Sequence, residues 1–256
     1  MDRFDEIGEA FLRASQNENM APTPEAQGLP FPSYLCEEPV NPESLISLPR
    51  PDTFDLGDLS FRELAEQRRS IRRYDTEAWM TLPELAWLLW ITQGIKRVSE
   101  KSGLTLRTVP SAGCRHPFET YLGVQRVEGV APGIYHYVAH LHALEPFSLL
   151  DSALPELTEA AKKQNHVLTS AVTFMWAAVP YRTSWRYGTR AYRYMHLDAG
   201  HVCQNLYLAA EAIGHGVCAI AAFDDELANA LLNLDGREKF VIYMASVGKK
   251  LPQPGA

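Results

Sequence analysis

The sequence predicts an α+β protein, and two observations carry that prediction. Helical and extended patterns are mixed along the 256 residues without the regular strand–helix alternation of a parallel sheet. Hydrophobic residues make up 46% of the chain and charged residues 21%, which is the balance of a folded globular protein rather than a disordered one. No apolar run reaches the roughly 18 residues that span a bilayer, so we expect no membrane segment.

The first 54 residues differ in character from the rest. Residues 1–20 have the spacing of a short amphipathic helix, and their acidic start is unlike a secretory signal or a transit peptide. The stretch 21–54 contains eight prolines and is interpreted as an extended arm or a linker. We therefore divide the chain into an arm at 1–54 and a domain at 55–256.

Helices downstream of the arm are predicted where a residue can cap a helix N-terminus, at Ser60, Thr81, Asp198, and Asp224 or Asp225. The first two of these are followed three residues later by glutamate, which is the capping-box pattern. The second helix is apolar on every side over 85–91, so we expect it to be buried or to lie in a subunit interface. The long third helix should end at the glycines 214 and 216.

Strands are predicted over 120–127, 133–147 as a hairpin, 171–179, 217–223 and 239–248. The hairpin carries His136, His140 and His142. Because the sequence offers no further ligands for a metal ion, we expect these histidines at exposed polar positions of the strands. Cys114 and His116 share one side of an extended segment but lack an orienting acid, so no thiol nucleophile is predicted there.

The spacing of the cysteines indicates the cellular compartment of the protein. The four cysteines are scattered and form no CxxC pair. This pattern indicates a reduced, cytoplasmic protein with neither a disulfide framework nor a structural zinc site.

The segment QRRSIRRY, at 67–74, concentrates positive charge in a chain whose formal net charge is −7. One interpretation is a helix C-terminus, where arginines complement the macrodipole. The other is an anion pocket, because Arg68, Arg69 and Arg72 can converge at a helix end and Ser70 adds a hydroxyl donor. Guanidinium groups offer the parallel N–H donors that suit a phosphate. A broad nucleic-acid surface is disfavoured by the acidic balance of the chain.

Two further segments have residues suited to binding a planar ligand. Pro110, Ser111, Ala112 and Gly113 form a small-residue loop before a strand, where such a ligand can approach the backbone; the alternative is a plain turn. Residues 180–201 interleave arginines with aromatic residues, which suits a planar organic substrate, single-stranded nucleic acid or an interface helix. No glycine-rich dinucleotide motif or P-loop occurs.

Taken together, RRSIRRYD, PSAGCRHPFETYLGV, LDAGHVCQNLYLAAEAIGHGVCAIAAFDD and YMASVGKK resemble the FMN-dependent nitroreductase-like superfamily. PSAG with RHP, the GIYHY…HALE hairpin and WRYGTRAYRYMHLDAGH resemble its SagB-type dehydrogenase branch, which includes azoline oxidases. The resemblance covers about residues 30–250. It implies a nitroreductase-like fold, a central and mostly antiparallel sheet flanked by helices, and an intertwined homodimer with two FMN sites at its interface.

The resemblance also implies a role for each segment. The FMN phosphate, ribityl chain and pyrimidine edge would be held by Arg68, Arg69, Ser70 and Arg72. The phosphate site would be completed by Lys249 and Lys250. The flavin ring would be contacted from the other subunit by Pro110, Ser111, Ala112 and Gly113. Ala221 and Ala222, at the end of the predicted strand 217–223, would place a backbone amide near flavin N5.

Two positions depart from the family pattern. Azoline oxidases resembling this chain carry a Lys-Tyr pair where it has Arg186-Tyr187. Because arginine stays protonated in proteins, proton abstraction would fall to Tyr187, with Arg186 stabilising the phenolate. Alternatively, Arg186 binds an anionic group of another substrate. The helix-ending GLG of many relatives is Gly-His-Gly here, and we expect His215 to lie near the surface.

The resulting prediction is an FMN-dependent dehydrogenase that oxidises a heterocycle, azoline to azole, in a peptide-derived natural product by hydride transfer to flavin N5. It would act on a small-molecule or peptide substrate, with a partner in a biosynthetic complex and no metal. Three alternatives stay open. They are an NAD(P)H-dependent nitro or quinone reductase, a non-catalytic flavin-binding partner, and an RNA-binding protein, whose affinity would depend steeply on salt.

Overall fold

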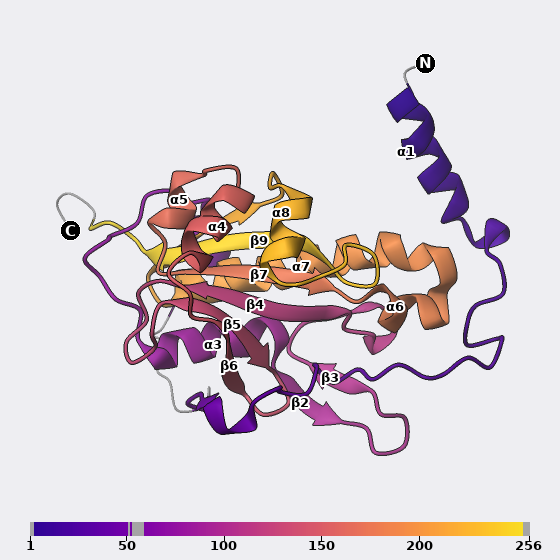
Figure 1. Ribbon diagram of the computed structural model, residues 1–256, viewed down its shortest axis with the longest axis horizontal. Coiled ribbons are helices and arrows are strands. Elements are labelled where there is room, and N and C mark those ends of the chain that lie inside the picture. The colour runs from indigo at the N-terminus through magenta and orange to yellow at the C-terminus, as the bar shows by residue number, and fades with distance from the viewer. Residues whose placement is uncertain (1–2, 51, 53–58, 253–256) are drawn as a thin grey trace.

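The computed structural model describes residues 3–50, 52 and 59–252 (Figure 1). Within these residues, seven strands form one sheet in the order β1-β6-β5-β4-β7-β9-β8, and every neighbouring pair is antiparallel. The strands are β1 (Ile46–Ser47), β4 (Phe118–Val124), β5 (Gly133–Val138), β6 (Ala143–Ser148), β7 (Val172–Ala178), β8 (His215–Ile220) and β9 (Phe240–Lys249). The predicted α+β class with a central antiparallel sheet is confirmed.

Helices cover both faces of this sheet, and a separate ribbon of β2 (Ile95–Val98) and β3 (Thr105–Arg107) lies beside it (Figure 1). The helices are α1 (Arg3–Ala14), α2 (Phe61–Gln67), α3 (Leu82–Gln93), α4 (Ala153–Ala160), α5 (Asn165–Leu168), α6 (Pro180–Tyr187), α7 (Ala191–Ala212) and α8 (Asp225–Leu231). In the described part of the chain, no helix combines the length and apolarity needed to cross a bilayer.

The central strand β7 shows how the core is divided. Phe174 and Trp176 pack in one cluster with α3 and α7, whereas Met175 and Ala177 pack in another with α4 and α8. Successive side chains of a strand point to opposite faces, so a strand covered on both sides is buried along its whole length. All seven residues of β7 are buried.

Local capping signals predicted the starts of three helices correctly. Ser60 and Thr81 both form complete capping boxes with the glutamate three residues later, and the Asp224 side chain accepts a hydrogen bond from the Leu227 N–H. The prediction for the long helix was wrong at its start. α7 begins at Ala191, and Asp198 is buried in its interior, where its carboxylate binds a distant loop instead of capping the helix.

Two histidines predicted to lie at the surface are buried. His136 is 4% exposed because its Nε2 atom lies 2.9 Å from the buried Glu119 carboxylate. His215 is 0% exposed, since the start of β8 packs close to the first turn of α3, with His215 Nε2 4.0 Å from Glu84 Oε2. Strand position alone did not reveal these non-local partners.

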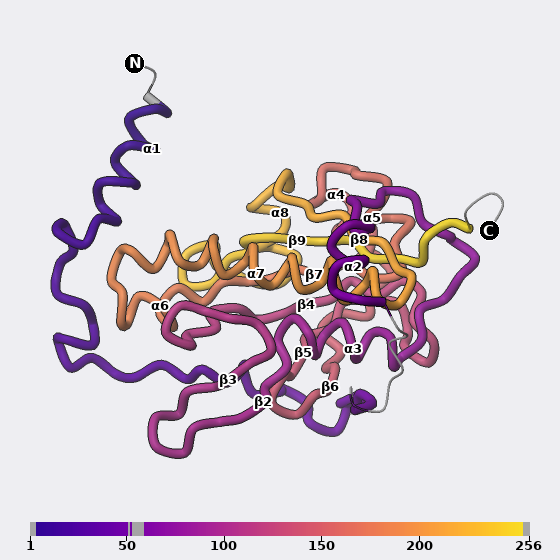
Figure 2. The backbone as a smooth tube through the Cα atoms, turned by 180° about the vertical axis from the view of Figure 1, so that it is seen from behind, coloured from indigo at the N-terminus to yellow at the C-terminus, as the bar shows by residue number. Residues whose placement is uncertain are grey.

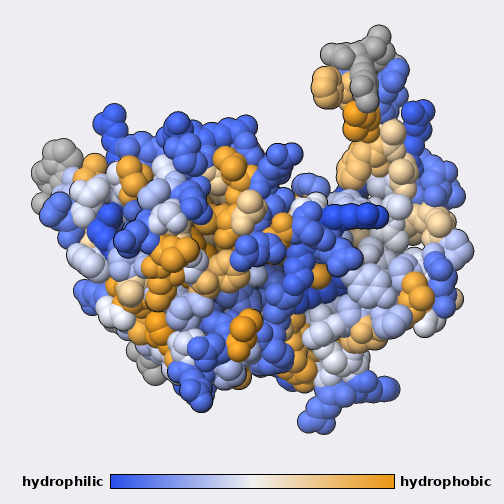
Figure 3. Space-filling model, in the orientation of Figure 1, coloured by the Kyte–Doolittle hydropathy of each residue, from blue (hydrophilic) through white to orange (hydrophobic). Residues whose placement is uncertain are grey.

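The proline-rich arm follows the surface of the domain, whereas α1 projects away from it (Figures 1 and 2). Tyr34 and Cys36 of the arm are buried, and β1 adds an edge strand beside β6, regular structure that the prolines did not predict. The prediction for residues 51, 53 and 54 of the arm lies outside the described residues. Apolar side chains gather on the projecting helix (Figure 3), where Phe4 and Ile7 are exposed.

Candidate functional site

The arginine segment lies against the ends of two strands. It follows α2 directly, and Arg68 is the C-cap residue of that helix. Ser70 forms a parallel bridge with Val217 of β8, and the Asp75 N–H donates to the Lys249 carbonyl of β9 at 3.0 Å. The structure therefore brings the predicted phosphate-binding segments 68–72 and 249–250 to one corner of the sheet.

Two glycines permit this close packing. A Cβ atom at Gly216 would lie 2.6 Å from the Cβ of Ile71, and one at Gly248 would lie 2.8 Å from Cγ of Tyr74. Real Cβ atoms do not approach other heavy atoms so closely, so neither position accepts a side chain without displacing its neighbour. The Tyr74 hydroxyl donates to the Ile71 carbonyl at 2.8 Å. The backbone that carries the arginines is thus fixed on both sides.

Tyr207 of α7 joins this corner and was not predicted as a site residue. Its hydroxyl lies 3.0 Å from Ser70 Oγ and accepts a hydrogen bond of 3.0 Å from the Ala219 N–H. The Arg68 guanidinium lies over the Tyr207 ring, with Cζ 5.2 Å from the ring centroid. A tyrosine on a largely apolar helix gives no sequence signal for this role.

The arginines and the lysines at the corner differ in whether they form ion pairs with carboxylates. Among the described residues, the ion pairs formed by arginines do not include Arg68, Arg69 or Arg72. Lys249 Nζ, in contrast, lies 3.8 Å from Glu84 Oε1, and Lys250 Nζ pairs with Glu211. Guanidinium groups without a carboxylate partner, next to a serine hydroxyl, are the donor set that an anion requires.

Ala221 and Ala222 follow β8 at its carboxyl end. Both are exposed, and the Ala222 carbonyl accepts a hydrogen bond from Gln164 Nε2 at 2.8 Å. They continue the strand that carries Ala219, the backbone partner of Tyr207. The predicted backbone contact therefore lies along the same strand as the arginine corner.

The small-residue loop 110–113 is held by a buried carboxylate. Ser111 Oγ donates to Asp198 Oδ2 at 2.5 Å, and the Ala112 N–H donates to Asp198 Oδ1 at 3.2 Å. Burial raises the pKa of Asp198, and the hydrogen bond from Ser111 opposes that shift. Arg115 Nε donates to the carbonyl of Gly113 at 2.8 Å. Asp198 and Arg115 therefore position the loop, a role that sequence reasoning missed.

Tyr187 and this loop are in contact within one chain. Gly113 has φ +56°, and a Cβ atom there would collide with the Tyr187 hydroxyl. The Tyr187 ring packs edge-on against Tyr194, with centroids 5.0 Å apart. Arg186 Cζ lies 6.0 Å from the Tyr187 ring centroid, and Arg186 Nη1 lies 3.9 Å from Glu25 Oε1 of the arm. Tyr187 is thus fixed at the loop, whereas Arg186 also contacts the arm.

Helix α7 separates the loop from the arginine corner. Asp198 anchors the loop and Tyr207 anchors the arginine corner. The two residues are nine positions apart, which is about two and a half helical turns and about 13 Å along the axis. Their side chains consequently leave α7 on opposite faces. α7 therefore does not bring the two predicted parts of the site together within one chain.

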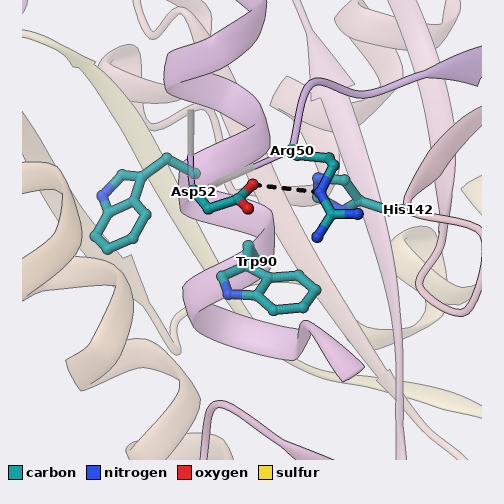
Figure 4. A pocket seen from close by; sticks show the side chains of 5 residues that line it. Arg50, Asp52, Trp90 and His142 are labelled. Carbon is teal, nitrogen blue, oxygen red and sulfur yellow. Dashed lines mark hydrogen bonds and ion pairs between the residues drawn. The ribbon is translucent and has the colours of Figure 1, made fainter. Parts of the chain in front are cut away.

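Of two cavities in the described residues, one borders the predicted site. A cavity of about 360 Å³ borders the loop and is lined by Ser111 and Cys114. A cavity of about 560 Å³ lies against α3 and holds none of the predicted site residues (Figure 4); its lining residues are Arg50, Asp52, Trp87, Trp90 and His142. The same described residues contain no group of histidine, cysteine and carboxylate side chains arranged for a metal ion.

His116, next to the loop, predicts acid sensitivity of the fold. Burial, followed by the charge of Arg107, lowers the pKa of His116 to about 3, against about 6.5 for an unfolded histidine. The unfolded chain therefore binds the proton first, and stability falls as pH drops below 6.5. We expect the His116 contribution to cost about 2 kcal/mol of unfolding free energy between pH 7 and pH 5.

Urea unfolding of the parent chain and of His116→Gln at both pH values measures this contribution. The variant should lose about 2 kcal/mol less than the parent on acidification. His196→Gln, which alters an exposed histidine, is the matched control and should behave like the parent. An equal acid loss in His116→Gln and the parent would contradict the assignment.

Comparisons with known proteins give a consistent result. The model of the "Nitroreductase family" matches residues 65–249. The nitroreductase MJ1384 of Methanocaldococcus jannaschii is 33% identical over 198 residues, which are 77% of this chain and 94% of that protein.

Two processing proteins are also similar, and each match covers about half of this chain. The trifolitoxin-processing protein TfxB of Rhizobium leguminosarum bv. trifolii is 30% identical over 133 residues, 50% of this chain and 36% of that protein. The microcin B17-processing protein McbC of Escherichia coli is 30% identical over 149 residues, 54% of this chain and 53% of that protein. The chain thus matches about half or less of the length of each of these two relatives.

Solved structures share the fold. A nitroreductase structure from Anabaena variabilis superposes with a TM-score of 0.68 at 23% identity, covering 93% of this chain and 46% of that one. A chain of the Escherichia coli microcin synthetase McbBCD complex gives a TM-score of 0.59 at 20% identity, covering 96% of this chain and 93% of that one. At these identities the likeness shows the fold.

Proposed function

The chain belongs to the nitroreductase family, and from this membership we propose that it is an FMN-dependent oxidoreductase. The observation that carries the proposal is the arginine corner: in the described part of the chain no carboxylate pairs with Arg68, Arg69 or Arg72, and the Ser70 hydroxyl lies 3.0 Å from that of Tyr207. The FMN phosphate, ribityl chain and pyrimidine edge would be bound by Arg68, Arg69, Ser70 and Arg72. Lys249 and Lys250 would join them by exchanging their present carboxylate partners for the phosphate.

We propose that the complete site forms between two copies of the chain. The loop 110–113 and the arginine corner lie on opposite faces of α7, so one copy would supply the loop and Tyr187 while the other supplies the corner. Ala221 and Ala222, at the end of β8, would contribute backbone contacts to the flavin ring. A homodimer with two such sites accounts for both groups of residues.

The substrate we propose is a heterocycle in a peptide-derived natural product, oxidised from azoline to azole. Similarity to the processing proteins TfxB and McbC supports this choice. Bound FMN would supply the acceptor for the two electrons that leave with the hydride. The Tyr187 hydroxyl oxygen, as phenolate, would take the proton that the heterocycle loses, and Arg186 would stabilise that phenolate.

The arm outside the flavin site would serve in assembly with other protein chains. Because the microcin synthetase that shares the fold is a complex of several proteins, we propose a partner in a biosynthetic complex, in the cytoplasm. The arm at 1–54 is the candidate segment for docking that partner or the second copy. Its projecting amphipathic helix α1, which exposes Phe4, Ile7, Phe11 and Leu12, supports this role.

A second candidate is an NAD(P)H-dependent nitro or quinone reductase. The relative MJ1384, a nitroreductase by name, favours it because the match extends over 94% of that protein. In that case the same arginine corner would bind FMN, and Tyr187 would have no proton to remove from a heterocycle.

Anaerobic stopped-flow reduction distinguishes the two candidates. FMN-loaded protein is mixed with an azoline-containing peptide or with NADPH, and the visible flavin absorbance is followed. The proposed function predicts faster bleaching with the azoline peptide than with NADPH. Rapid bleaching by NADPH with none by the peptide would replace it with the reductase function. No bleaching by either would identify a flavin-binding partner without catalytic activity of its own.

A further inference from the structure

A second group of reactive side chains lies away from the arginine corner and the loop. Cys36, on the arm, has its Sγ atom 2.9 Å from His140 Nδ1. The Ala139 N–H donates to the same sulfur at 3.0 Å. His140 Nε2 lies 3.4 Å from Glu38 Oε2. A thiol, an imidazole and a carboxylate in this order are the arrangement of an activated nucleophile, its base and an orienting acid.

The carboxylate of Glu38 selects the form of His140 that can act as a base. An imidazole Nε2–H facing Glu38 leaves Nδ1 with a lone pair toward Cys36. The thiol can then donate its proton to Nδ1. Burial, reinforced by the Glu119 charge, raises the pKa of the Cys36 thiol to about 11, so this sulfur depends on its neighbouring base for deprotonation.

A cavity of about 310 Å³ adjoins the sulfur and is lined by Cys36, Glu37, Tyr181 and Arg182. Arg182 is 5% exposed, and its Nη2 atom bonds the Glu119 carboxylate. Its other terminal nitrogen, Nη1, is buried and has no hydrogen-bond partner among residues 3–50, 52 and 59–252. Nη1 is itself closed to solvent, so what Arg182 brings to the cavity wall is its positive charge, which Glu119 balances.

The low exposure of Cys36 limits what can reach the sulfur. Cys36 is only 5% exposed, which excludes a peptide or another protein as the direct reaction partner. A small oxidant that reacts with thiols can enter the adjoining cavity of about 310 Å³. Hydrogen peroxide has these properties.

We propose that Cys36 is a peroxide-reactive thiol, independent of the FMN function. His140 Nδ1 takes the thiol proton while Cys36 Sγ attacks one peroxide oxygen, so that an S–O bond forms and the O–O bond breaks. The departing oxygen receives the proton from His140 and leaves as water. The sulfur is oxidised to sulfenic acid and the peroxide is reduced, so no further reactant is needed.

The test compares cysteines within the full-length chain. Protein carrying Cys114→Ser, which removes the partly exposed thiol, is treated with hydrogen peroxide and dimedone, and each cysteine is quantified by peptide mass spectrometry. Cys203 is the internal control, because it is 3% exposed and has the Tyr243 hydroxyl in place of a histidine. We expect Cys36 to be labelled at least about tenfold faster than Cys203.

Two variants then test the assigned roles. His140→Gln should slow labelling of Cys36 by about 100-fold, and Glu38→Gln should slow it severalfold. Glu38 has an exposed side chain, so its replacement leaves the core intact even if His140→Gln proves unstable in a thermal unfolding control. Labelling of Cys36 no faster than Cys203, or unchanged by Glu38→Gln and by a folded His140→Gln, would overturn the proposal.

Discussion

A Tyr187→Phe variant is expected to lose turnover by about 10²- to 10⁴-fold while retaining bound flavin. The phenylalanine keeps the ring that packs against Tyr194 at 5.0 Å, so the local structure should be preserved. It removes only the hydroxyl, which lies against Gly113 of the loop. Because Arg186 stays protonated and cannot act as a base, Tyr187 is the proposed proton acceptor.

The measurement is kcat with an azoline peptide, together with the visible flavin spectrum of each preparation. Tyr192→Phe is the matched control, because Tyr192 is an exposed tyrosine at the start of α7. The control should keep both the parent kcat and the parent spectrum. Unchanged turnover in Tyr187→Phe would remove Tyr187 from the mechanism, whatever the flavin content.

Replacing an arginine of the corner should weaken FMN binding. Each charge-assisted hydrogen bond to a phosphate contributes about 1.5–3 kcal/mol, so Arg68→Ala and Arg72→Ala should each raise the Kd for FMN by about 10- to 100-fold. Arg73→Ala is the matched control, since Arg73 is an exposed neighbour outside the predicted set. Fluorescence titration of flavin-free protein measures the Kd of every variant.

Riboflavin, which lacks the phosphate, shows where the arginines act. The parent chain should bind riboflavin more weakly than FMN, and Arg72→Ala should change riboflavin binding far less than FMN binding. A variant that loses affinity for both ligands equally would show that Arg72 supports the fold of the site rather than the phosphate. High salt should weaken FMN binding in the parent more than in the arginine variants, because salt screens exposed charges.

Most of the fold could be predicted because its signals are local. Capping boxes at Ser60 and Thr81 and the cap at Asp224 depend on neighbours three residues away, and they mark the helix starts correctly. Side chains of β7 point alternately to the two faces of the sheet, and helices cover both faces. Asp198 is also a residue type that caps helices. Its side chain instead binds Ser111, 87 positions away, so it lies inside α7 rather than at its start.

The site was predictable in its parts and not in its assembly. Charge and residue size identified the arginine segment and the loop, because both properties are visible in the sequence. Tyr207 could not be found, since its hydroxyl gains a role only when Ser70 is placed beside it by β8. α7 separates the loop from the arginine corner, and only the tertiary structure shows this separation. For this reason the proposed site requires a second copy of the chain.

The proposed function depends on binding of the phosphate end of FMN at the arginine corner. Titration of the purified, flavin-free chain with FMN, followed by visible absorbance and by the molecular mass of the complex, tests it most directly. We expect saturable binding of one FMN per chain, a yellow complex and a dimer that carries two flavins. A chain that stays colourless and leaves the FMN spectrum and fluorescence unchanged at millimolar concentrations would contradict it.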